Sequence, residues 1–346
     1  MDARAAEQPR IRCGPFHEAE GADPVGSAGH YDAFLVVEVP LPWGRDISMS
    51  EPFATLAGGE VTAAFVGADG RRWRPVGVVP PGPVGAEGVR VTAHERPAPV
   101  GGGSASAPGS HHAGPYRRRE WTVPPAELVG LCRSLLDGTS LPTAARAEEV
   151  DEDVVDLLVC THGRRDVCCG GAGSELFVEM DERAAGRSGI RVRRCSHTGG
   201  HRFAPTAITF PDGVGWAHLD AATAWAVARR GEGDVVPVAA CRGAASVPGG
   251  AWQAVDREGL ARWGWRWAAA ERLLVAVTPA ADEGLSDAIT VEATASLPDD
   301  GPVGLRAVAG VGRHVPMPEC GARDLGDCPI EPEWHVQEVE VRGPAQ

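Results

Sequence analysis

Short hydrophobic runs recur along the N-terminal part of the chain, each bounded by glycine, proline or charged residues. Runs of this length that are rich in valine and aromatic residues are typical of β-strands. Residues 124–138 differ, because their hydrophobic positions recur at helical spacing between prolines and a glycine, which predicts an amphipathic helix. Strands are predicted at residues 31–40, 60–67, 71–79, 88–95 and 116–123, and a short helix at residues 48–59.

The middle of the chain alternates between strand-like and helix-like patterns. Ser174 and Asp220 are suitable N-caps for two helices, and Asp212-Gly213 suits a hairpin turn between two strands. The resulting order is strand, helix, strand and then strand, strand, helix, which is the order of a thioredoxin-like domain. The N-terminal half follows a blurred version of the same order, which suggests a degenerate internal duplication. Strands are predicted at residues 153–160, 189–194, 206–211 and 214–219, and helices at 174–187 and 220–231.

Beyond residue 245 the pattern changes to a C-terminal α+β region. Residues 251–265 begin with helical spacing and then become extended. Trp263, Trp265 and Trp267 alternate with other residues, which predicts that they lie on one face of a strand and pack in a core or an interface. Further strands are predicted at residues 272–279, 288–296, 303–310 and 334–342.

These elements divide the chain into five regions of a mixed α+β or α/β fold. The central region is predicted to be a thioredoxin-like domain, and a Gly/Ser/Pro-rich segment in the N-terminal half is predicted to be a flexible linker. The regions are an N-terminal α/β region at 1–95, the linker at 96–115, a strand and helix that complete the N-terminal region at 116–150, the thioredoxin-like domain at 151–245 and a C-terminal β-rich appendage at 246–346.

The composition is that of a globular protein with an acidic surface. About 43% of the 346 residues are hydrophobic, which is enough for a substantial core. The formal net charge is −14, and all 33 basic residues are arginines. Because phosphate backbones are bound by basic surfaces, this charge argues against a general nucleic-acid-binding function.

The N-terminal segment lacks the hydrophobic stretch of a signal peptide, and no run of 18 hydrophobic residues would cross a membrane. We therefore expect a cytoplasmic protein that does not associate with membranes. The cytosol keeps thiols reduced, so the nine cysteines indicate metal binding or catalysis rather than a disulfide framework.

Cysteine and histidine residues gather in two short segments of the central region. The first, C-T-H-G-R-R-D-V-C-C-G, begins where a predicted strand ends, and the second, C-S-H-T-G-G-H, follows the next strand. Thiolate and imidazole are ligands of zinc and of iron–sulfur clusters, and a [2Fe–2S] cluster accepts histidine in place of two of its four cysteines. We therefore predict a [2Fe–2S] cluster between these loops. The candidate ligands are Cys160, His162, Cys168, Cys169, Cys195, His197 and His201.

Two other interpretations use the same residues. A zinc site with two cysteines and two histidines would stabilise a binding module. A thioredoxin-like thiol enzyme would use Cys168, Cys169 or Cys195 as its redox thiol, although the C-x-x-C motif of such enzymes is absent. Zinc hydrolase chemistry is disfavoured, because a threonine stands where H-E-x-x-H has its glutamate, and the two glycines that follow disfavour a regular helix.

Cysteine and histidine residues elsewhere have simpler interpretations. Cys132 lies on the predicted amphipathic helix and is interpreted as a small core residue. His111 and His112 lie in the predicted linker and are interpreted as solvated. Cys320 and Cys328 lie in a Gly/Asp-rich loop, where a second metal site is the less favoured interpretation.

The two central motifs resemble those of the sucrase/ferredoxin-like family, C-T-H-G-x-R-D-x-C-C-G followed by C-S-H-x-G-G-H-R-F-A. The resemblance extends to L-V-V-E-V-P-L-P-W-G-R-D near the N-terminus, to G-V-G-W-A-H-L-D and to the Cys-Arg-Gly at 241–243, where relatives often have Tyr-Arg-Gly. It implies a thioredoxin-like, bis-histidinyl [2Fe–2S] ferredoxin in which Cys168 is not a ligand. The ligands that it implies are Cys160, Cys169, His197 and His201.

The resemblance further implies a one-electron carrier rather than an enzyme, with a reductase or an acceptor protein as its redox partner. Two neutral imidazole ligands make the cluster less negative, so its reduction potential is expected to lie above that of an all-cysteine cluster. Reduction is expected to be coupled to proton uptake, because a more negative cluster favours protonated imidazole. Charged residues beside the motifs are candidates for tuning the cluster or docking the partner: Arg165, Asp166, Arg194 and Arg202.

Overall fold

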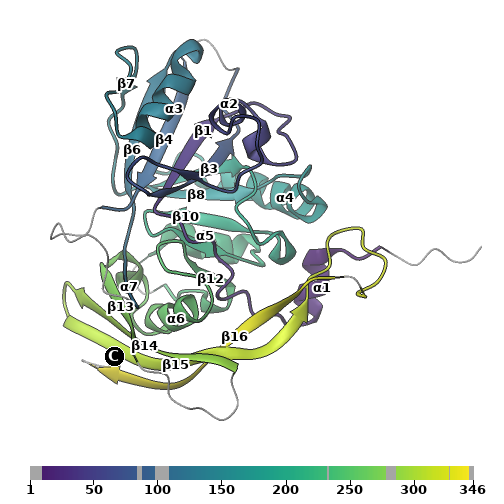
Figure 1. The fold of residues 1–346 in the computed structure, drawn as a ribbon, viewed down its shortest axis with the longest axis vertical. Helices are drawn as coiled ribbons and strands as arrows, with labels where there is room; N and C mark the ends of the chain where they lie inside the picture. Colours follow the sequence, from purple (N-terminus) through teal and green to yellow (C-terminus); the bar gives the residue numbers. More distant parts are fainter. Residues whose placement is uncertain are drawn as a thin grey trace, which may run out of the picture.

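Mixed α/β architecture organises the molecule, with helices packed against two β-sheets in the part of the chain that is described (Figure 1). The computed structural model describes residues 10–83, 88–97, 109–231, 234–277, 286–326 and 328–342. Across these ranges the larger sheet has 11 strands and the smaller one has five. The mixed α/β class predicted from the sequence is confirmed.

The N-terminal half of the larger sheet is built around β1 (Ala33–Glu38), a run of hydrophobic residues buried on both faces. β1 pairs in parallel with β3 (Arg72–Val78) and antiparallel with β4 (Val89–Glu95). β2 (Phe65–Val66) pairs with β3, β6 (Arg117–Val123) with β4, and β7 (Arg146–Ala147) with β6.

The second half of this sheet is built in the same way around β8 (Val155–Cys160), which is also buried throughout. β8 pairs in parallel with β9 (Ile190–Cys195) and antiparallel with β10 (Ala207–Phe210). β11 (Val214–Trp216) pairs with β10, and β12 (Cys241–Ala244) pairs with β11. The order β11-β10-β8-β9 therefore repeats the order β6-β4-β1-β3 of the N-terminal half, with the same strand directions.

The two halves are joined by a short antiparallel pairing of β3 with β9, which we call the seam. Its paired residues are Val78 and Cys195. Two backbone hydrogen bonds flank this pair, from the N–H of Val79 to the carbonyl of Arg194 (3.0 Å) and from the N–H of Ser196 to the carbonyl of Gly77 (2.7 Å). The seam thus lies at the end of β9, where the second Cys/His motif begins.

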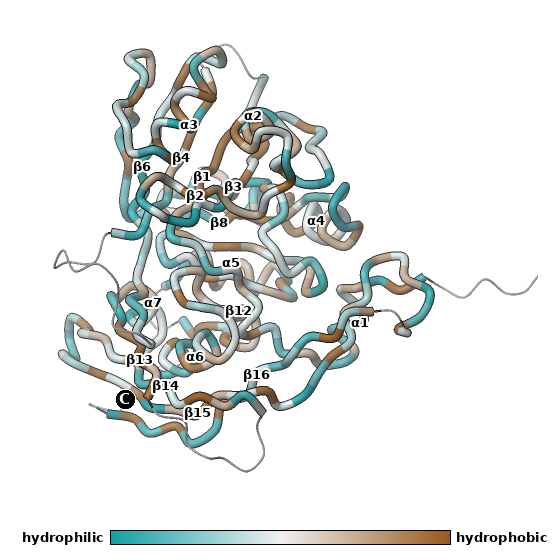
Figure 2. Tube along the Cα trace, in the orientation of Figure 1, coloured by the Kyte–Doolittle hydropathy of each residue, from teal (hydrophilic) through white to brown (hydrophobic). Residues whose placement is uncertain are grey.

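Alternate residues of the central strands point into different cores. Leu157 and Val159 of β8 face a large hydrophobic cluster that includes helices and the C-terminal sheet. The neighbouring residues of β8 point into a cluster shared with β1, which contains Phe34, Val36, Leu158 and Cys160. Figure 2 shows hydrophobic stretches in the interior and hydrophilic ones in many outer loops. The candidate ligand Cys160 therefore belongs to the core between the two halves.

Helices cover both halves and separate the two sheets (Figure 1). α4 packs against β8 and β9, and α6 packs between β12 and the smaller sheet. α1 packs against the 3₁₀-helix at His201–Phe203 and lies beside one end of the β15–β16 hairpin. The helices are α1 (Cys13–Ala19), α2 (Phe53–Leu56), α3 (Leu128–Asp137), α4 (Val167–Ala184), α5 (Ala221–Arg229), α6 (Ala251–Trp263) and α7 (Trp265–Ala269). Among the helices described, none is both long and hydrophobic enough to cross a membrane.

The smaller sheet is antiparallel and lies along α6 (Figure 1). In sheet order its strands are β16 (Ile330–Arg342), β15 (Gly301–Pro316), β14 (Ser286–Leu297), β13 (Arg272–Val277) and β5 (Ser110–Ala113). β5 comes from the segment predicted as a linker, so this part of the segment is ordered by pairing with β13. Residues 98–108, the rest of the Gly/Ser-rich stretch, lie outside the described residues.

The tryptophans predicted on a strand lie on helices instead. Trp263 ends α6, and Trp265 and Trp267 belong to α7. Gly264, with φ of 59°, separates the two helices and reverses the chain there. The Trp263 and Trp267 rings are stacked with centroids 5.0 Å apart. The strand prediction was wrong because alternation over five residues does not distinguish a strand from two short helices around a glycine.

Candidate metal centre

Cys160 and Cys169 come from two elements that meet in the core. Cys160 is the last residue of β8, and Cys169 lies in the first turn of α4. Both side chains have no exposed surface. The predicted helix at 174–187 begins earlier than expected, at Val167, so the second cysteine is held by a helix rather than by a loop.

The early start of α4 has a local cause. Asp166 is the N-cap, and its carboxylate accepts a hydrogen bond of 2.8 Å from the N–H of Cys168. Glycines then allow the helix to lie close to the strand end. A Cβ at Gly170 would lie 2.4 Å from the Cα of Gly163, and a Cβ at Gly173 would lie 2.1 Å from the carbonyl oxygen of Cys160. Any larger residue at either position would push Cys169 away from Cys160.

His197 and His201 lie in the segment that follows β9, just beyond the seam. Between them, Gly199 and Gly200 have φ of 90° and 65°, a left-handed conformation that other residues rarely adopt. His201 then starts the 3₁₀-helix η3 (His201–Phe203). The glycine pair therefore turns the H-x-G-G-H motif into a loop, as the sequence predicted, and places the two imidazoles side by side, with a centroid distance of 5.5 Å and ring planes tilted by 49°.

Three of the four predicted ligands converge on one point. The sulfur atoms of Cys160 and Cys169 and a ring nitrogen of His197 all lie within 4.8 Å of one another. His201 is not within this group, but its ring neighbours that of His197. The cysteines are buried and the histidines are half-buried, so the histidine side of the centre faces solvent.

The protonation of these groups suits a cation. A hydrogen bond from the Cys169 thiol, aided by His197, lowers the pKa of Cys160 well below its ordinary value. The same contact, together with burial, raises the pKa of Cys169, so the two thiols share one proton. Burial and the charge of His197 lower the pKa of His201, which keeps its imidazole neutral at neutral pH. Neutral imidazole and thiolate are the forms that bind metals.

One nitrogen at this centre has no partner. Nδ1 of His197 is buried, and it finds no hydrogen-bond partner among the described residues. A buried polar atom without a partner costs free energy, so its presence here needs an explanation. A metal or cluster bound between the cysteines and histidines would supply one, and the donor set of two sulfurs and two imidazoles fits.

The other candidate ligands lie beside the centre. Nε2 of His162 lies 2.8 Å from the carbonyl oxygen of Gly44, and its Nδ1 accepts a hydrogen bond of 3.2 Å from the N–H of His197. His162 is thus used on both nitrogens and orients the second motif. Cys195 is buried in the seam, where burial raises the pKa of its thiol, and it packs in the core between the halves. Cys168 points to a different group of residues.

Two arginines that the sequence did not single out as site residues hold the His loop. Arg242, in β12, is buried and donates hydrogen bonds to the carbonyls of Gly199 (3.1 Å) and Ser27 (2.7 Å). Burial lowers the pKa of Arg242 to about 10, so it stays charged. Arg74 donates a 2.8 Å hydrogen bond to the carbonyl of His197. The only sequence signal for either was the Cys-Arg-Gly segment.

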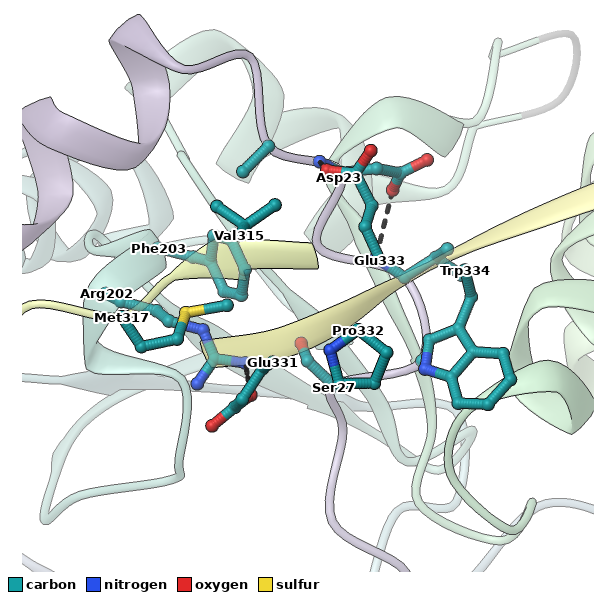
Figure 3. Close-up of a pocket in the computed structure, with 13 residues that line it drawn as sticks. Asp23, Ser27, Arg202, Phe203, Val315, Met317, Glu331, Pro332, Glu333 and Trp334 are labelled. Atoms are coloured by element: carbon teal, nitrogen blue, oxygen red, sulfur yellow. Dashed lines mark hydrogen bonds and ion pairs between the residues drawn. The ribbon is translucent and has the colours of Figure 1, made fainter. Parts of the chain in front are cut away.

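Of the four charged candidates, Asp166 caps α4, and the three arginines have distinct places. Arg165 donates its backbone N–H to His162, and the Arg194 guanidinium lies 5.7 Å from the centre of the Phe177 ring. Arg202 pairs with Glu331 and lines a cleft of about 180 Å³ between the N-terminal segment and β16. Figure 3 shows the pair beside Met317 and Phe203 in that cleft. Arg202 is therefore committed to a contact within the chain.

Comparisons with known proteins add a family. No solved structure matches this chain. Altered inheritance of mitochondria protein 32 from Meyerozyma guilliermondii is 35% identical over 66 residues, which are 18% of this chain and 23% of that protein, so the match spans less than a quarter of its length. The model of the sucrase/ferredoxin-like family matches residues 24–243, well over half of the chain and including both Cys/His motifs. The chain therefore belongs to the sucrase/ferredoxin-like family.

Proposed function

We propose that this protein is a one-electron carrier that holds a [2Fe–2S] cluster. Its ligands are Cys160, Cys169, His197 and His201. The observation that carries the proposal is the convergence of two buried cysteines with two adjacent imidazoles, one of which has a buried nitrogen without a partner among the described residues. The family's printed description as ferredoxin-like agrees with this assignment.

The strand order supports a thioredoxin-like arrangement for the half that holds the centre. In thioredoxin-like domains a parallel pair lies beside an antiparallel pair, and β11-β10-β8-β9 has this arrangement. The N-terminal half repeats it around β1, which supports the degenerate duplication. The proposed cluster then lies where the two repeats meet.

Two histidine ligands supply a cluster of raised reduction potential that accepts and releases one electron. The residues around the proposed cluster control its access to water and the charge beside it. Burial excludes water from the cysteines, and Arg242 adds a buried positive charge behind the His loop. The half-buried histidines form the edge nearest to solvent, where an electron would enter or leave. Burial lowers the pKa of His201, which favours its neutral form before reduction, so proton uptake on reduction stays part of the proposal.

The partner is proposed to be a reductase or an acceptor protein that binds over the histidine edge. The net charge of −14 favours a partner with a basic docking surface, because complementary charge raises the rate of encounter. Such binding would weaken as the salt concentration rises.

A reactive-thiol enzyme is less well supported. Cys169 and Cys195 are fully buried, and the pKa values of all three candidate redox thiols, Cys168, Cys169 and Cys195, are raised mainly by burial and by neighbouring thiols, whereas a redox thiol needs thiolate character and access to its substrate. A zinc module with the same ligands has no such obstacle and must be separated by experiment.

Metal analysis of anaerobically purified protein tests the proposal. We expect a red-brown protein with visible absorption, about two irons per chain and an electron paramagnetic resonance signal after reduction. Cys160→Ser should abolish all three, whereas Cys132→Ser, in the core of the other half, should change none of them. A colourless protein with one zinc, or a metal-free protein with a reactive thiol, would overturn the proposal.

A further inference from the structure

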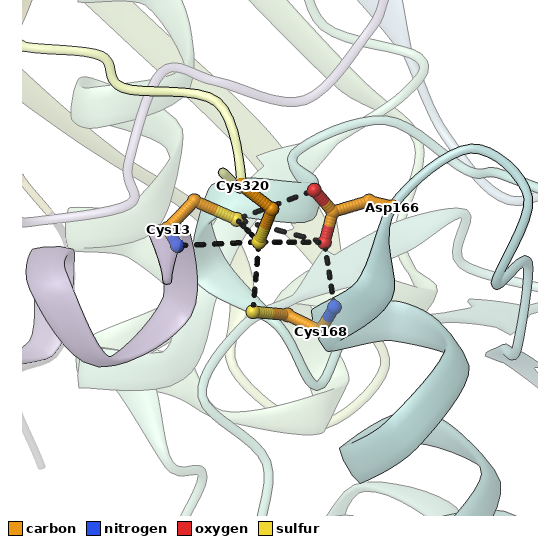
Figure 4. A group of neighbouring side chains, drawn as sticks. All are labelled: Cys13, Asp166, Cys168 and Cys320. Atoms are coloured by element: carbon orange, nitrogen blue, oxygen red, sulfur yellow. Dashed lines mark hydrogen bonds between the residues drawn. The ribbon is translucent and has the colours of Figure 1, made fainter. Parts of the chain in front are cut away.

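A second group of cysteines lies next to the first centre. Cys13 from α1, Cys168 from α4 and Cys320 from the loop between β15 and β16 bring their sulfurs together with the carboxylate of Asp166 (Figure 4). The Cys320 sulfur lies 3.2 Å from that of Cys168 and 3.3 Å from that of Cys13. All four ligand atoms lie within 4.8 Å of one another. We call these residues the Cys3Asp cluster.

The Cys3Asp cluster is built from segments that are far apart in the chain. Cys13 and Cys320 lie outside residues 24–243, the range of the family match. Their segments pair through backbone hydrogen bonds of 2.9 Å from Ile11 to Ala322 and from Gly321 to Ile11. The N-terminal segment and the C-terminal loop are thus brought together beside the helix that carries Cys169.

Ordinary packing does not account for this arrangement. The Asp166 side chain is only 6% exposed and Cys13 is fully buried. The Asp166 carboxylate accepts hydrogen bonds from the N–H of Cys168 and from the thiols of Cys13 and Cys320, and none of the four residues of the cluster supplies a positive charge to balance it. A disulfide does not account for it either, because a disulfide has sulfurs about 2.05 Å apart and engages only two of the three cysteines.

The distances suit a single ion. Zinc binds thiolates at about 2.3 Å in tetrahedral geometry, which places neighbouring sulfurs about 3.8 Å apart. The observed separations of 3.2 and 3.3 Å require the side chains to open by only a few tenths of an ångström. The Asp166 oxygens lie 3.5 and 3.6 Å from the Cys13 sulfur, which is also within reach of a shared ion.

Local hydrogen bonds stabilise negative charge at the sulfurs. The N–H of Cys13 donates to the Cys320 sulfur at 3.4 Å, and the N–H of Gly14 donates to the Cys168 sulfur. Cys168 also lies in the first turn of α4, an 18-residue helix whose N-terminus favours anions. Asp166 caps this helix through Oδ1, and its Oδ2 accepts a hydrogen bond from the Cys13 thiol, which a bound ion would replace once that thiol loses its proton.

We propose that Cys13, Cys168, Cys320 and Asp166 form a structural zinc site that fastens the N-terminal segment and the C-terminal loop to α4. Zn²⁺ is the expected ion because four ligands from one protein, three of them thiolates, make a closed tetrahedral site of the kind that zinc occupies. Binding releases the thiol protons and involves no change of oxidation state. The site does not depend on what the first centre binds.

Metal content of matched variants tests the proposal. In protein produced with zinc in the medium we expect about one zinc per chain. Cys320→Ser should lose this zinc and keep the iron and the visible absorption. Cys328→Ser, in the same loop but outside the cluster, should keep both metals. Cys160→Ser should lose the iron and keep the zinc. The iron and zinc contents therefore test the proposed cluster and the proposed zinc site separately.

Cobalt binding provides a test that does not depend on the amount of zinc that the protein retains through purification. In Cys160→Ser protein, which lacks the absorption of the first centre, added Co²⁺ should give the intense visible bands of tetrahedral thiolate coordination. Adding Cys320→Ser should remove them, and adding Asp166→Asn, which keeps the helix cap, should weaken binding without unfolding the chain. Either of two results would overturn the proposal. One is loss of iron from the Cys320→Ser variant. The other is a wild-type protein that stays free of zinc after zinc is supplied, with its cysteines either free or joined in a disulfide.

Discussion

Substitution of Gly173 by alanine tests how closely α4 must approach β8. The new Cβ would lie 2.1 Å from the carbonyl oxygen of Cys160, and an ordinary contact begins at 3.4 Å. Because the obstacle is backbone, the helix would have to move by about 1.3 Å. Gly171 provides a matched control on the same helix, because a Cβ there meets nothing within 4 Å.

The two variants are expected to change the free energy of unfolding in opposite directions. Alanine in place of an exposed helical glycine stabilises by about 1 kcal/mol, so Gly171→Ala should raise the free energy of unfolding. Overpacking against a rigid neighbour costs about 1–3 kcal/mol, and the upper end applies here because a carbonyl group cannot turn aside. Gly173→Ala combines this cost of about 3 kcal/mol with the same gain of about 1 kcal/mol in helix propensity, so it should be about 2 kcal/mol less stable than wild type.

Thermal unfolding and iron content are the measurements. At about 2–4 °C per kcal/mol, the two variants should differ in Tm by roughly 6–12 °C. Gly173→Ala should also bind less iron, because Cys169 moves with the helix and ligand distances are tolerated only within about 0.2 Å. Equal stability of the two variants, with full iron in both, would refute the close approach of α4 to Cys160.

Three further outcomes are expected. The double variant His197→Cys/His201→Cys should keep a cluster but lower its reduction potential, since thiolates add negative charge; an unchanged potential, measured by spectroelectrochemical titration, would argue against histidine ligation. Arg242→Gln should lower the iron content several-fold, because the charge and the guanidinium's hydrogen bonds to Gly199 and Ser27 are both lost. Arg242→Lys should lower the iron content less, because lysine keeps the charge but cannot reproduce those hydrogen bonds. Equal iron content in the two variants would contradict this. Burial alone would raise the pKa of Asp156, but the hydrogen bond and charge of Arg191 outweigh it and lower the pKa below 3.8. The stability from Asp156 is therefore present above pH 3.8 and is lost as the pH falls below it, so Asp156→Asn should flatten the acid side of a plot of unfolding free energy against pH.

Local patterns located the first centre. Cysteines and histidines gather after two predicted strands, which indicated two ligand loops. The family resemblance then singled out Cys160, Cys169, His197 and His201 among the candidates. Hydrophobic runs likewise predicted β1 and β8. The start of α4 was missed because Asp166 is a cap inside a ligand motif, and the glycines after it suggested a loop.

Contacts between distant segments could not be predicted in the same way. The sequence offered a second metal site at Cys320 and Cys328 only as the less favoured interpretation. Cys13 and Cys320 are separated by 307 positions, and nothing in the sequence linked Cys320 to Cys13 or Cys168. Arg242 was visible only as part of a short motif, although it holds the His loop from another strand. Such contacts depend on which sheet edges pair, and hydrophobic periodicity says nothing about that pairing.

The seam has a consequence for the assembly of the protein. Cys160 and Cys169 are fully buried, so the iron and sulfide of the proposed cluster could not reach them in the closed structure. The backbone hydrogen bonds that flank the Val78–Cys195 pair contribute only about 1 kcal/mol each, so the two halves are held together mainly by the hydrophobic cluster that they share. All four proposed ligands lie in the second half, between the end of β8 and the start of η3. The cluster would therefore be loaded on that half before the N-terminal half closes over Cys160.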